Sequence, residues 1–360
     1  MTAADIPTSE TVTAAWLSEQ LQRAGYDATV QSFTAERIGT GQIGKCLRYA
    51  LQLAPGSAPD TPASLVGKFP SDDPASRATG VALHNFLREV RFYQELQQRV
   101  TIRTPRCYFA AIDGEGPHFA LLLEDLAPAT QGDQLQGCDP GQADAAIREL
   151  VGLHAPSWCD ESLKQLEWLY QHDPATEHAS RDLYRQTLPG FVERFGPVLA
   201  EDERAIIERV GDVDTGPLGG QLPSLFSLVH VDYRLDNLMF KALDSGFQVT
   251  AVDWQSITLG RPLNDVAYFL GAGLLPEVRR DVEEAIVRTY HDGLLAHGIT
   301  DFPWDVCWEN YRRGVFAGFG VTVIASMLVQ RTARGDEMFT AMARRHARHA
   351  LDLGAGEFLV

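Results

Sequence analysis

Hydrophobic and polar positions alternate in the first third of the chain. Leu47, Tyr49, Leu51 and Leu53 are separated by Arg48, Ala50 and Gln52, a period of two that predicts a half-buried strand. Further strands are expected at 28–33, 64–69, 106–112 and 118–123. Phe86, Val90 and Tyr93 recur instead at helical spacing, so a helix interrupts the series. Three strands, a helix and two strands predict an α+β region with an antiparallel sheet.

The pattern changes after Leu126, where long helical periodicities take over. Helices are expected at 141–155, 176–210, 276–297, 303–331 and 336–353, with short apolar runs at 227–231, 238–240 and 249–252. The chain of 360 residues also exceeds the ~250–300 residues at which one core usually stops growing. We therefore expect two parts, residues 1–127 and 128–360.

Composition and charge exclude several classes of protein. The chain has 31 basic and 48 acidic side chains, a net charge of −17, and 45% hydrophobic residues. These values are those of a globular protein, and the negative charge argues against a nucleic-acid or anionic-membrane binder. The apolar run 315–329 contains Gly, Thr and Ser and is shorter than the ~20 residues of a membrane span, so we expect a buried helix and no membrane insertion.

The cysteines and the first residues of the chain bear on its cellular location. Five cysteines occur without a C-x-x-C pair, and MTAADIPTSE has neither the basic nor the apolar region of a signal peptide. Both features favour reduced thiols in the cytoplasm. The sequence indicates no oligomeric state.

A glycine loop precedes the strand at Leu47. Gly39, Gly41 and Gly44 give G-x-G-x-x-G within ERIGTGQIGKCL. A dinucleotide-binding fingerprint requires a helix after the glycines, and a P-loop requires Ser or Thr where Cys46 stands. The strand–loop–strand context leaves two interpretations open: a kinase-type glycine-rich loop over nucleotide phosphates, or an ordinary glycine turn.

Three further features of residues 1–127 have a place in phosphoryl transfer. Lys68 lies in an apolar strand and is a candidate for the lysine that neutralises nucleotide phosphates, although an edge-strand lysine reaching for water would look the same. Glu89 on the following helix is its candidate acidic partner, with Glu95 as the alternative. LLLEDL, with Glu124 and Leu126, could form a hinge whose main chain binds the base.

The strongest motif is LVHVDYRLDNLMF. His230, Asp232 and Asn237 form H-x-D-x-x-x-x-N between two apolar runs, and Asp253 follows the strand VTAV. Asp232 is the candidate proton acceptor, while Asn237 and Asp253 are hard oxygen ligands suited to Mg²⁺. Arg234 could offset γ-phosphate charge, and His230 is expected mainly to brace the loop. All these motifs occur in the order that phosphoryl transfer requires.

With these segments together, the chain resembles the aminoglycoside phosphotransferase-like kinases. The likeness is greatest to the choline/ecdysteroid-kinase-like branch and to phosphotransferase domains beside acyl-CoA dehydrogenases. It is carried by GTGQIG, LVGKFP, EVRFYQEL, LLLEDL, HVDYRLDNLMF and VDWQSITLGRPLNDVAYFL. The resemblance implies a two-lobed protein-kinase-like fold: a small antiparallel-sheet N-lobe (1–127) that binds ATP, or GTP, and a helical C-lobe (128–360) with the catalytic loop, the Mg²⁺ ligands and the acceptor pocket.

Two positions need comment against this family pattern. Val231 stands where the family usually has glycine, and a β-branched residue adopts a positive φ only with strain. Asp265, in GRPLNDVAYFL, matches a family aspartate that is expected to be structural.

The acceptor is expected to be a small-molecule hydroxyl. Twelve positions separate Asp253 from Asp265, without D-F-G or A-P-E, which leaves no activation segment to dock a peptide. An aminoglycoside-like compound or a lipophilic alcohol or hydroxyacyl group would each fit. Candidate pocket residues, which could equally be core residues, are His154, Trp158, Trp168, Tyr170, Phe316 and Phe319. Two other hypotheses stay open: a nucleotide-binding pseudokinase acting as a regulatory module, and a globular protein with accidental motifs.

Overall fold

The computed structural model describes residues 6–39, 43–170, 179–213 and 222–359. The chain forms two compact units. Unit 1 contains residues 1–98, 104–128 and 253–256, and unit 2 contains 99–103, 129–252 and 257–360. Two short segments thus differ from a simple division at residue 127: residues 99–103 belong to unit 2, and residues 253–256 belong to unit 1. No described helix is long and apolar enough to span a membrane.

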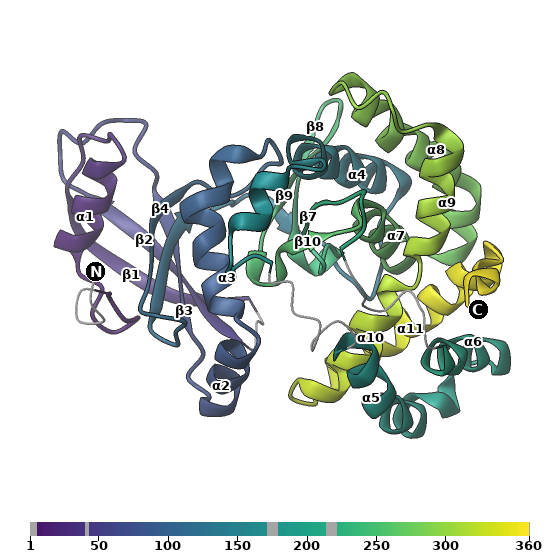
Figure 1. The fold of residues 1–360 in the computed structure, drawn as a ribbon. Helices are drawn as coiled ribbons and strands as arrows, with labels where there is room; N and C mark the ends of the chain where they lie inside the picture. The colour runs from purple at the N-terminus through teal and green to yellow at the C-terminus, as the bar shows by residue number, and fades with distance from the viewer. Residues whose placement is uncertain (1–5, 40–42, 171–178, 214–221, 360) are drawn as a thin grey trace. The chain divides into compact units, whose positions relative to one another are not determined.

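Unit 1 is built on a five-stranded antiparallel sheet (Figure 1). The strand order is β1-β2-β3-β5-β4. The strands are β1 (Val30–Ile38), β2 (Gly44–Leu53), β3 (Ser64–Pro70), β4 (Cys107–Ile112) and β5 (Phe119–Glu124). The expected antiparallel sheet of an α+β fold is confirmed.

Two helices of unit 1 were not expected from the sequence. Helix α1 (Ala14–Arg23) begins at Thr13, whose side chain accepts a hydrogen bond from Trp16 N, and α2 (Pro74–Ala82) begins at Asp73, which accepts from Ser76 N. Leu17 and Leu21 of α1 share a core with Tyr49 and Leu122 of the sheet. Because side chains alternate along a strand, Lys68 of β3 lies on the opposite face from its neighbour Phe69, which belongs to this core.

The expected helix between β3 and β4 forms one helical stretch of three parts. These are α3 (Asn85–Arg91), a π-helical turn η2 (Phe92–Leu96) and a 3-10 turn η3 (Gln97–Arg99). Phe86, Val90 and Tyr93 are buried, as their spacing predicted. Phe92 stacks on Trp254 with ring centroids 3.9 Å apart, and Asn85 Nδ2 donates to the carbonyl of Gln255. These contacts fix the 3-10 turn η8 (Trp254–Ser256) against the helical stretch.

Unit 2 is mostly helical. Its α-helices are α4 (Pro140–His154), α5 (Ala179–Phe195), α6 (Glu201–Asp212), α7 (Pro262–Gly273), α8 (Pro276–Ala296), α9 (Trp304–Gly314), α10 (Ala317–Leu328) and α11 (Ala333–Asp352). Its 3-10 turns are η4 (Ala155–Ser157), η5 (Glu161–Gln165), η6 (Gly196–Val198), η7 (Leu235–Asn237) and η9 (Ala355–Phe358). Helices α8 and α9 pack side by side (Figure 1).

Two helices expected to be continuous are broken. The segment 176–210 divides into α5 and α6 at η6, where Pro197 cannot continue the hydrogen bonding of a helix. The segment 303–331 divides into α9 and α10. Val315 and Phe316 at this break are both fully buried, so the bend places two large apolar side chains in the core. The predicted burial of the 315–329 run is correct for Phe319, Val323 and Ser326 but not for exposed Leu328.

Two small sheets of unit 2 flank the LVHVDYRLDNLMF segment. Strand β7 (Ser227–Val229) pairs with β10 (Thr258–Gly260), and β8 (Leu238–Leu243) pairs with β6 (Thr130–Gln131) and β9 (Gly246–Ala251). The segment therefore leaves one sheet at Val229 and enters another at Leu238. All five cysteines of the chain are free.

Candidate functional site

Lys68 forms two ion pairs within unit 1. Its Nζ lies 2.7 Å from a carboxylate oxygen of Glu89 on α3 and 2.7 Å from Oδ1 of Asp253. Glu95, the alternative partner considered from the sequence, pairs with Arg91 at 2.9 Å. The structure therefore brings together Lys68, Glu89 and Asp253, which are separated by up to 185 positions in the sequence.

The backbone around Asp253 permits this arrangement. Asp253 has a φ of 67°, in the left-handed region that aspartate tolerates better than most residues. The main-chain N–H of the next residue, Trp254, donates to Glu89. Two consecutive residues thus serve this cluster: Asp253 gives its carboxylate to Lys68, and Trp254 donates its main-chain N–H to Glu89.

Burial and charge act in opposite directions on the titration of these groups. Burial by itself would lower the pKa of Lys68, but the carboxylates of Asp253 and Glu89 raise it above its usual value. Burial raises the pKa of Glu89 to about 7, against the opposing effect of Lys68. Burial also raises the pKa of Cys46, the residue paired with Lys68 on β2, to about 11. The lysine is therefore a fixed positive charge, and the neighbouring thiol stays protonated.

The glycine loop connects β1 and β2 as a hairpin, with Ile38 opposite Cys46. Gly39 has a φ of 72°, a conformation that side chains disfavour. A Cβ on Gly44 would lie 3.0 Å from Cε of Lys68, so this glycine leaves room for the lysine. Gly41 lies outside the described residues.

The LLLEDL segment is held by Asp125. Its buried carboxylate accepts from Arg48 Nε at 2.7 Å and from Ser64 Oγ at 2.7 Å. Burial alone would raise the pKa of Asp125, but these donors lower it. Glu124 ends β5 and accepts from the main-chain N–H of Arg106, while Leu126 follows the strand. The order of this segment depends on Asp125, to which the sequence analysis assigned no role.

In unit 2, Asp265 organises the start of the catalytic-loop candidate. Its carboxylate accepts from the main-chain N–H groups of His230 at 2.6 Å and Val231 at 3.0 Å. Val231 has a φ of 71°, a strained value for a β-branched residue. The two hydrogen bonds to a buried charge hold this turn, and Asp265 has the structural role expected for it.

His230 is fully buried, and its Nε2 lies 3.0 Å from the carbonyl oxygen of Val252. The side chain therefore connects the loop to the end of β9. The bracing role expected from the sequence stays a prediction, and this is the contact through which it would act.

Asp232 is surrounded by hydrogen-bond donors. Tyr268 Oη donates to Oδ1 at 2.9 Å, Arg234 Nε to Oδ1 at 3.0 Å, and Asn237 Nδ2 to Oδ2 at 2.8 Å. The Asp232 side chain is 20% exposed, so solvent still reaches it. The donors fix the orientation of a carboxylate that remains accessible.

Arg234 has two carboxylate partners. Besides Asp232, it contacts Asp236 through Nη1 at 2.6 Å. Burial would lower the pKa of Arg234, but Asp232 and Asp236 raise it. Arg234 is thus a permanent cation whose charge is directed at these two aspartates.

Tyr268 of α7 is the contact of Asp232 that the sequence did not reveal. Its side chain is almost completely buried, and burial raises its pKa well above the usual value, so the hydroxyl remains a donor. The ring stacks on His346 of α11, with centroids 5.3 Å apart and planes at 9°. AYFL reads as a buried helix segment, and only its packing shows which of its side chains meets Asp232.

Three of the six residues considered for an acceptor pocket are core residues. His154 is fully buried, with Nδ1 2.8 Å from Tyr290 Oη, and Phe316 and Phe319 are also buried. Trp158, Trp168 and Tyr170 are half-buried. The structure has two cavities that are described below, and none of these six residues lines either of them.

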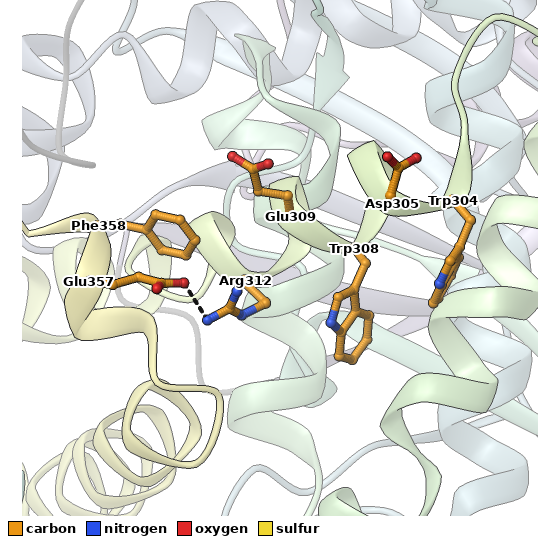
Figure 2. Close-up of a pocket in the computed structure, with 7 residues that line it drawn as sticks. All are labelled: Trp304, Asp305, Trp308, Glu309, Arg312, Glu357 and Phe358. Carbon is orange, nitrogen blue, oxygen red and sulfur yellow. Dashed lines mark ion pairs between the residues drawn. The ribbon is translucent and has the colours of Figure 1, made fainter.

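One of these cavities follows an exposed face of α9 (Figure 2). It is lined by Trp304, Asp305, Trp308, Glu309 and Arg312 of α9 and by Glu357 and Phe358. The rings of Trp304 and Trp308 stack on each other, and Arg312 pairs with Glu357 at 2.6 Å. None of the predicted site residues contributes to this cavity.

A family comparison accounts for this combination of features. The model of the ecdysteroid kinase-like family matches residues 41–299, which is more than half of the chain. The chain belongs to this family. No curated protein matches the sequence.

Solved structures show that the chain has a kinase-like fold. Choline kinase from Cryptosporidium parvum Iowa II is 9% identical, with 98% of this chain and 93% of that chain covered and a TM-score of 0.54. The GDP and kanamycin complex of APH(2'')-IIIa is 13% identical, with 85% and 89% covered and a TM-score of 0.50. At these identities the likeness concerns the fold. The predicted protein-kinase-like fold is therefore confirmed.

Proposed function

We propose that this member of the ecdysteroid kinase-like family transfers the γ-phosphate of ATP, with Mg²⁺, to the hydroxyl group of a small organic molecule. The observation that carries the proposal is the position of Lys68 between Glu89 and Asp253 at 2.7 Å from each. Phosphoryl transfer requires a fixed cation for the phosphates and a carboxylate for the metal. This arrangement supplies both next to a glycine loop.

In this proposal, unit 1 binds the nucleotide. The main chain of the Gly39–Gly44 loop covers the phosphates, and Lys68 contacts the α- and β-phosphates while Glu89 holds its amine in place. The main chain near Glu124 and Leu126 receives the base. GTP is a second candidate donor, since a fold neighbour was solved with GDP.

The residues present suit a magnesium ion. Among the described residues, no three His, Cys, Asp or Glu side chains cluster around a potential metal site. Magnesium typically uses one or two protein carboxylates and completes its shell with substrate phosphates and water. Asp253, whose side chain is 28% exposed, and Asn237, whose Nδ2 faces Asp232, are the proposed ligands. The ion would neutralise charge on the β- and γ-phosphates.

Asp232 is the proposed general base. It takes the proton of the acceptor hydroxyl as that oxygen attacks the γ-phosphorus and the bond to the β-phosphate breaks. Three donors keep its carboxylate in one orientation. Arg234 acts on the base and on Asp236 in this structure, so we assign it a positioning role. His230 braces the same loop.

The connection after Asp253 supports a small acceptor. The chain forms η8, then β10, and enters α7 at Pro262. No described segment here has the length of a peptide-docking activation loop. Fold neighbours include a choline kinase and a kanamycin complex, and the family is named for ecdysteroids. An alcohol of one of these types is the proposed partner, and five free cysteines favour a cytoplasmic location.

Nucleotide binding is tested first, by thermal unfolding with Mg²⁺-ATP and Mg²⁺-GTP. Ligand at 100 times its dissociation constant should stabilise the native state by ~2.7 kcal/mol. Asp253→Asn should weaken the shift, because asparagine keeps the shape and tolerates a positive φ but lacks the charge. Asp113→Asn, in an exposed turn of unit 1, is the matched control. If neither nucleotide shifts the thermal unfolding midpoint, the proposed function is wrong.

Transfer is then tested by ADP formation with a panel containing an ecdysteroid, choline and kanamycin. Asp232→Asn should abolish acceptor-dependent turnover while nucleotide binding persists. Binding without transfer to any acceptor would favour the regulatory pseudokinase instead. Full turnover in Asp232→Asn would contradict the assignment of the base.

A further inference from the structure

A second cavity in unit 2, of about 440 Å³, is rich in arginine. It is lined by Arg280 of α8 and by Arg344, Arg345 and Arg348 of α11, together with Glu203, Pro276 and Ala341. Four arginines thus line one cavity of a chain whose net charge is −17. None of the residues proposed for phosphoryl transfer lines it.

The positive charge in this cavity is only partly neutralised. Arg280 pairs with Asp352 at 2.8 Å, and Arg348 pairs with Asp202 at 3.0 Å and with Glu203 at 3.1 Å. Arg344 and Arg345 contact no carboxylate among the described residues. They donate to main-chain carbonyl oxygens, which are neutral. Within the part of the chain that the structure describes, two of the four arginines therefore form no ion pair.

Arg345 is the better-fixed of these two. Its side chain is buried, and its Nη atoms donate to the carbonyl oxygens of Gln134, Leu135 and Ala272 at 2.7–2.9 Å. Burial lowers the pKa of Arg345, against the opposing effect of Glu277 and Asp133. Burying a charge is costly, and an anion in the cavity would offset part of this cost.

The N-terminal turns of two helices contribute residues to this cavity. Pro276 is the first residue of α8, and Glu203 lies in the first turn of α6. The N-cap residues, Leu275 and Ala200, provide no side-chain hydrogen bond to the free N–H groups. The Glu203 carboxylate accepts from Ala200 N at 3.0 Å, and the first turn of α6 also carries Glu201 and Asp202, so this N-terminus already has its counter-charges. The first turn of α8 carries one acidic residue, Glu277.

We propose that this cavity binds a small molecule through a phosphate or an equivalent oxyanion group. Guanidinium groups bind such groups with two parallel hydrogen bonds, and a helix N-terminus favours the same charge. The volume suits a small ligand. The net charge of −17 opposes a polyanionic surface such as nucleic acid.

Inorganic phosphate and pyrophosphate are the probes, titrated by calorimetry into the full chain. The test variant is Arg280→Gln with Arg344→Gln, because both side chains are solvent-exposed and their loss should leave the fold intact. The control is Arg288→Gln with Arg313→Gln, which removes the same charge from exposed arginines outside the cavity. Lys68→Met tests whether the probe binds at the proposed nucleotide site instead.

We expect saturable binding that weakens at least tenfold in the cavity variant and by less than twofold in the control and in Lys68→Met. Unchanged thermal unfolding midpoints would show that all variants are folded. No binding to wild type would overturn the proposal. Loss of binding in Lys68→Met alone, or an equal loss in the cavity variant and its control, would also overturn it.

Discussion

Tyr268 donates a hydrogen bond to Asp232 from a position 36 residues later in the chain, at 2.9 Å. The tyrosine is buried in α7 and stacked on His346, so its hydroxyl has little freedom to move. Asp232, by contrast, is partly accessible. The core of unit 2 thus orients the carboxylate that we propose as the base.

Tyr268→Phe removes this donor without removing the ring. Hydrogen bonds to charged groups contribute about 1.5–3 kcal/mol, so turnover should fall roughly tenfold or more, with little change in the KM for the nucleotide. Initial rates at varied nucleotide concentration separate this fall in turnover from any change in KM.

Tyr233→Phe is the control for this prediction. Tyr233 is equally buried, and its hydroxyl donates to the carbonyl of Ala146 at 2.8 Å rather than to Asp232. It should lose stability while the turnover of the folded enzyme changes by less than about twofold. The same fall in turnover in both variants would mean that Tyr268 acts only through the stability of the fold.

Asp265→Asn should destabilise the protein strongly. The substitution removes the charge that accepts from the main-chain N–H groups of His230 and Val231. Asparagine offers one carbonyl oxygen for two donors, so we expect a loss of about 2–4 kcal/mol in the free energy of unfolding. Urea unfolding measures this value. Asp281→Asn, on the exposed face of α8, should change it by less than about 0.5 kcal/mol.

Val231→Gly should be tolerated, because the native φ of 71° favours glycine. Relief of strain, about 1–3 kcal/mol, opposes the greater freedom of glycine in the unfolded chain, about 0.4–1 kcal/mol. The free energy of unfolding should thus stay equal or rise slightly, and turnover should change less than about twofold. Val229→Gly, in a buried strand, should instead cost at least about 2 kcal/mol. A matching loss at Val231 would contradict the strain argument.

His346 should make the protein sensitive to acid. Burial lowers its pKa to about 3, whereas an unfolded histidine titrates near 6.5. Between these values the unfolded state binds the proton and the folded state does not, so stability is present above pH 6.5 and is lost as pH falls towards 3. This one group contributes a slope of up to about 1.4 kcal/mol per pH unit.

His346→Phe keeps an aromatic ring against Tyr268 and should remove that contribution from the pH dependence of unfolding. The slope between pH 6.5 and 4 is measured by urea unfolding for both proteins. His118→Gln, at an exposed position, is the control. An unchanged slope in His346→Phe would show that other groups dominate acid unfolding.

The sequence by itself determined the kinds of element and the chemistry that their motifs suggest. Alternation identified β2, a short apolar run identified β3, and helical spacing identified α3, because the apolar side chains of each must leave water. It missed α1 and α2, which are only 10 and 9 residues long, and it ran α9 into α10 because apolar residues continue across the bend. The motifs also singled out Lys68, Asp232 and Asp253.

Only the tertiary structure decided which of these side chains meet. Glu89 and Glu95 were both possible partners of Lys68, and the choice depended on the rotation of α3 against the sheet. Packing between distant helices brings Tyr268 to Asp232, and among the described residues it leaves Arg344 and Arg345 bonded to carbonyl oxygens and without an ion pair. Periodic patterns of hydrophobic residues can be recognised in the sequence because burial repeats with the period of a helix or strand. Hydrogen bonds and ion pairs depend on distances between side chains that are far apart in the sequence, so only the folded structure determines them.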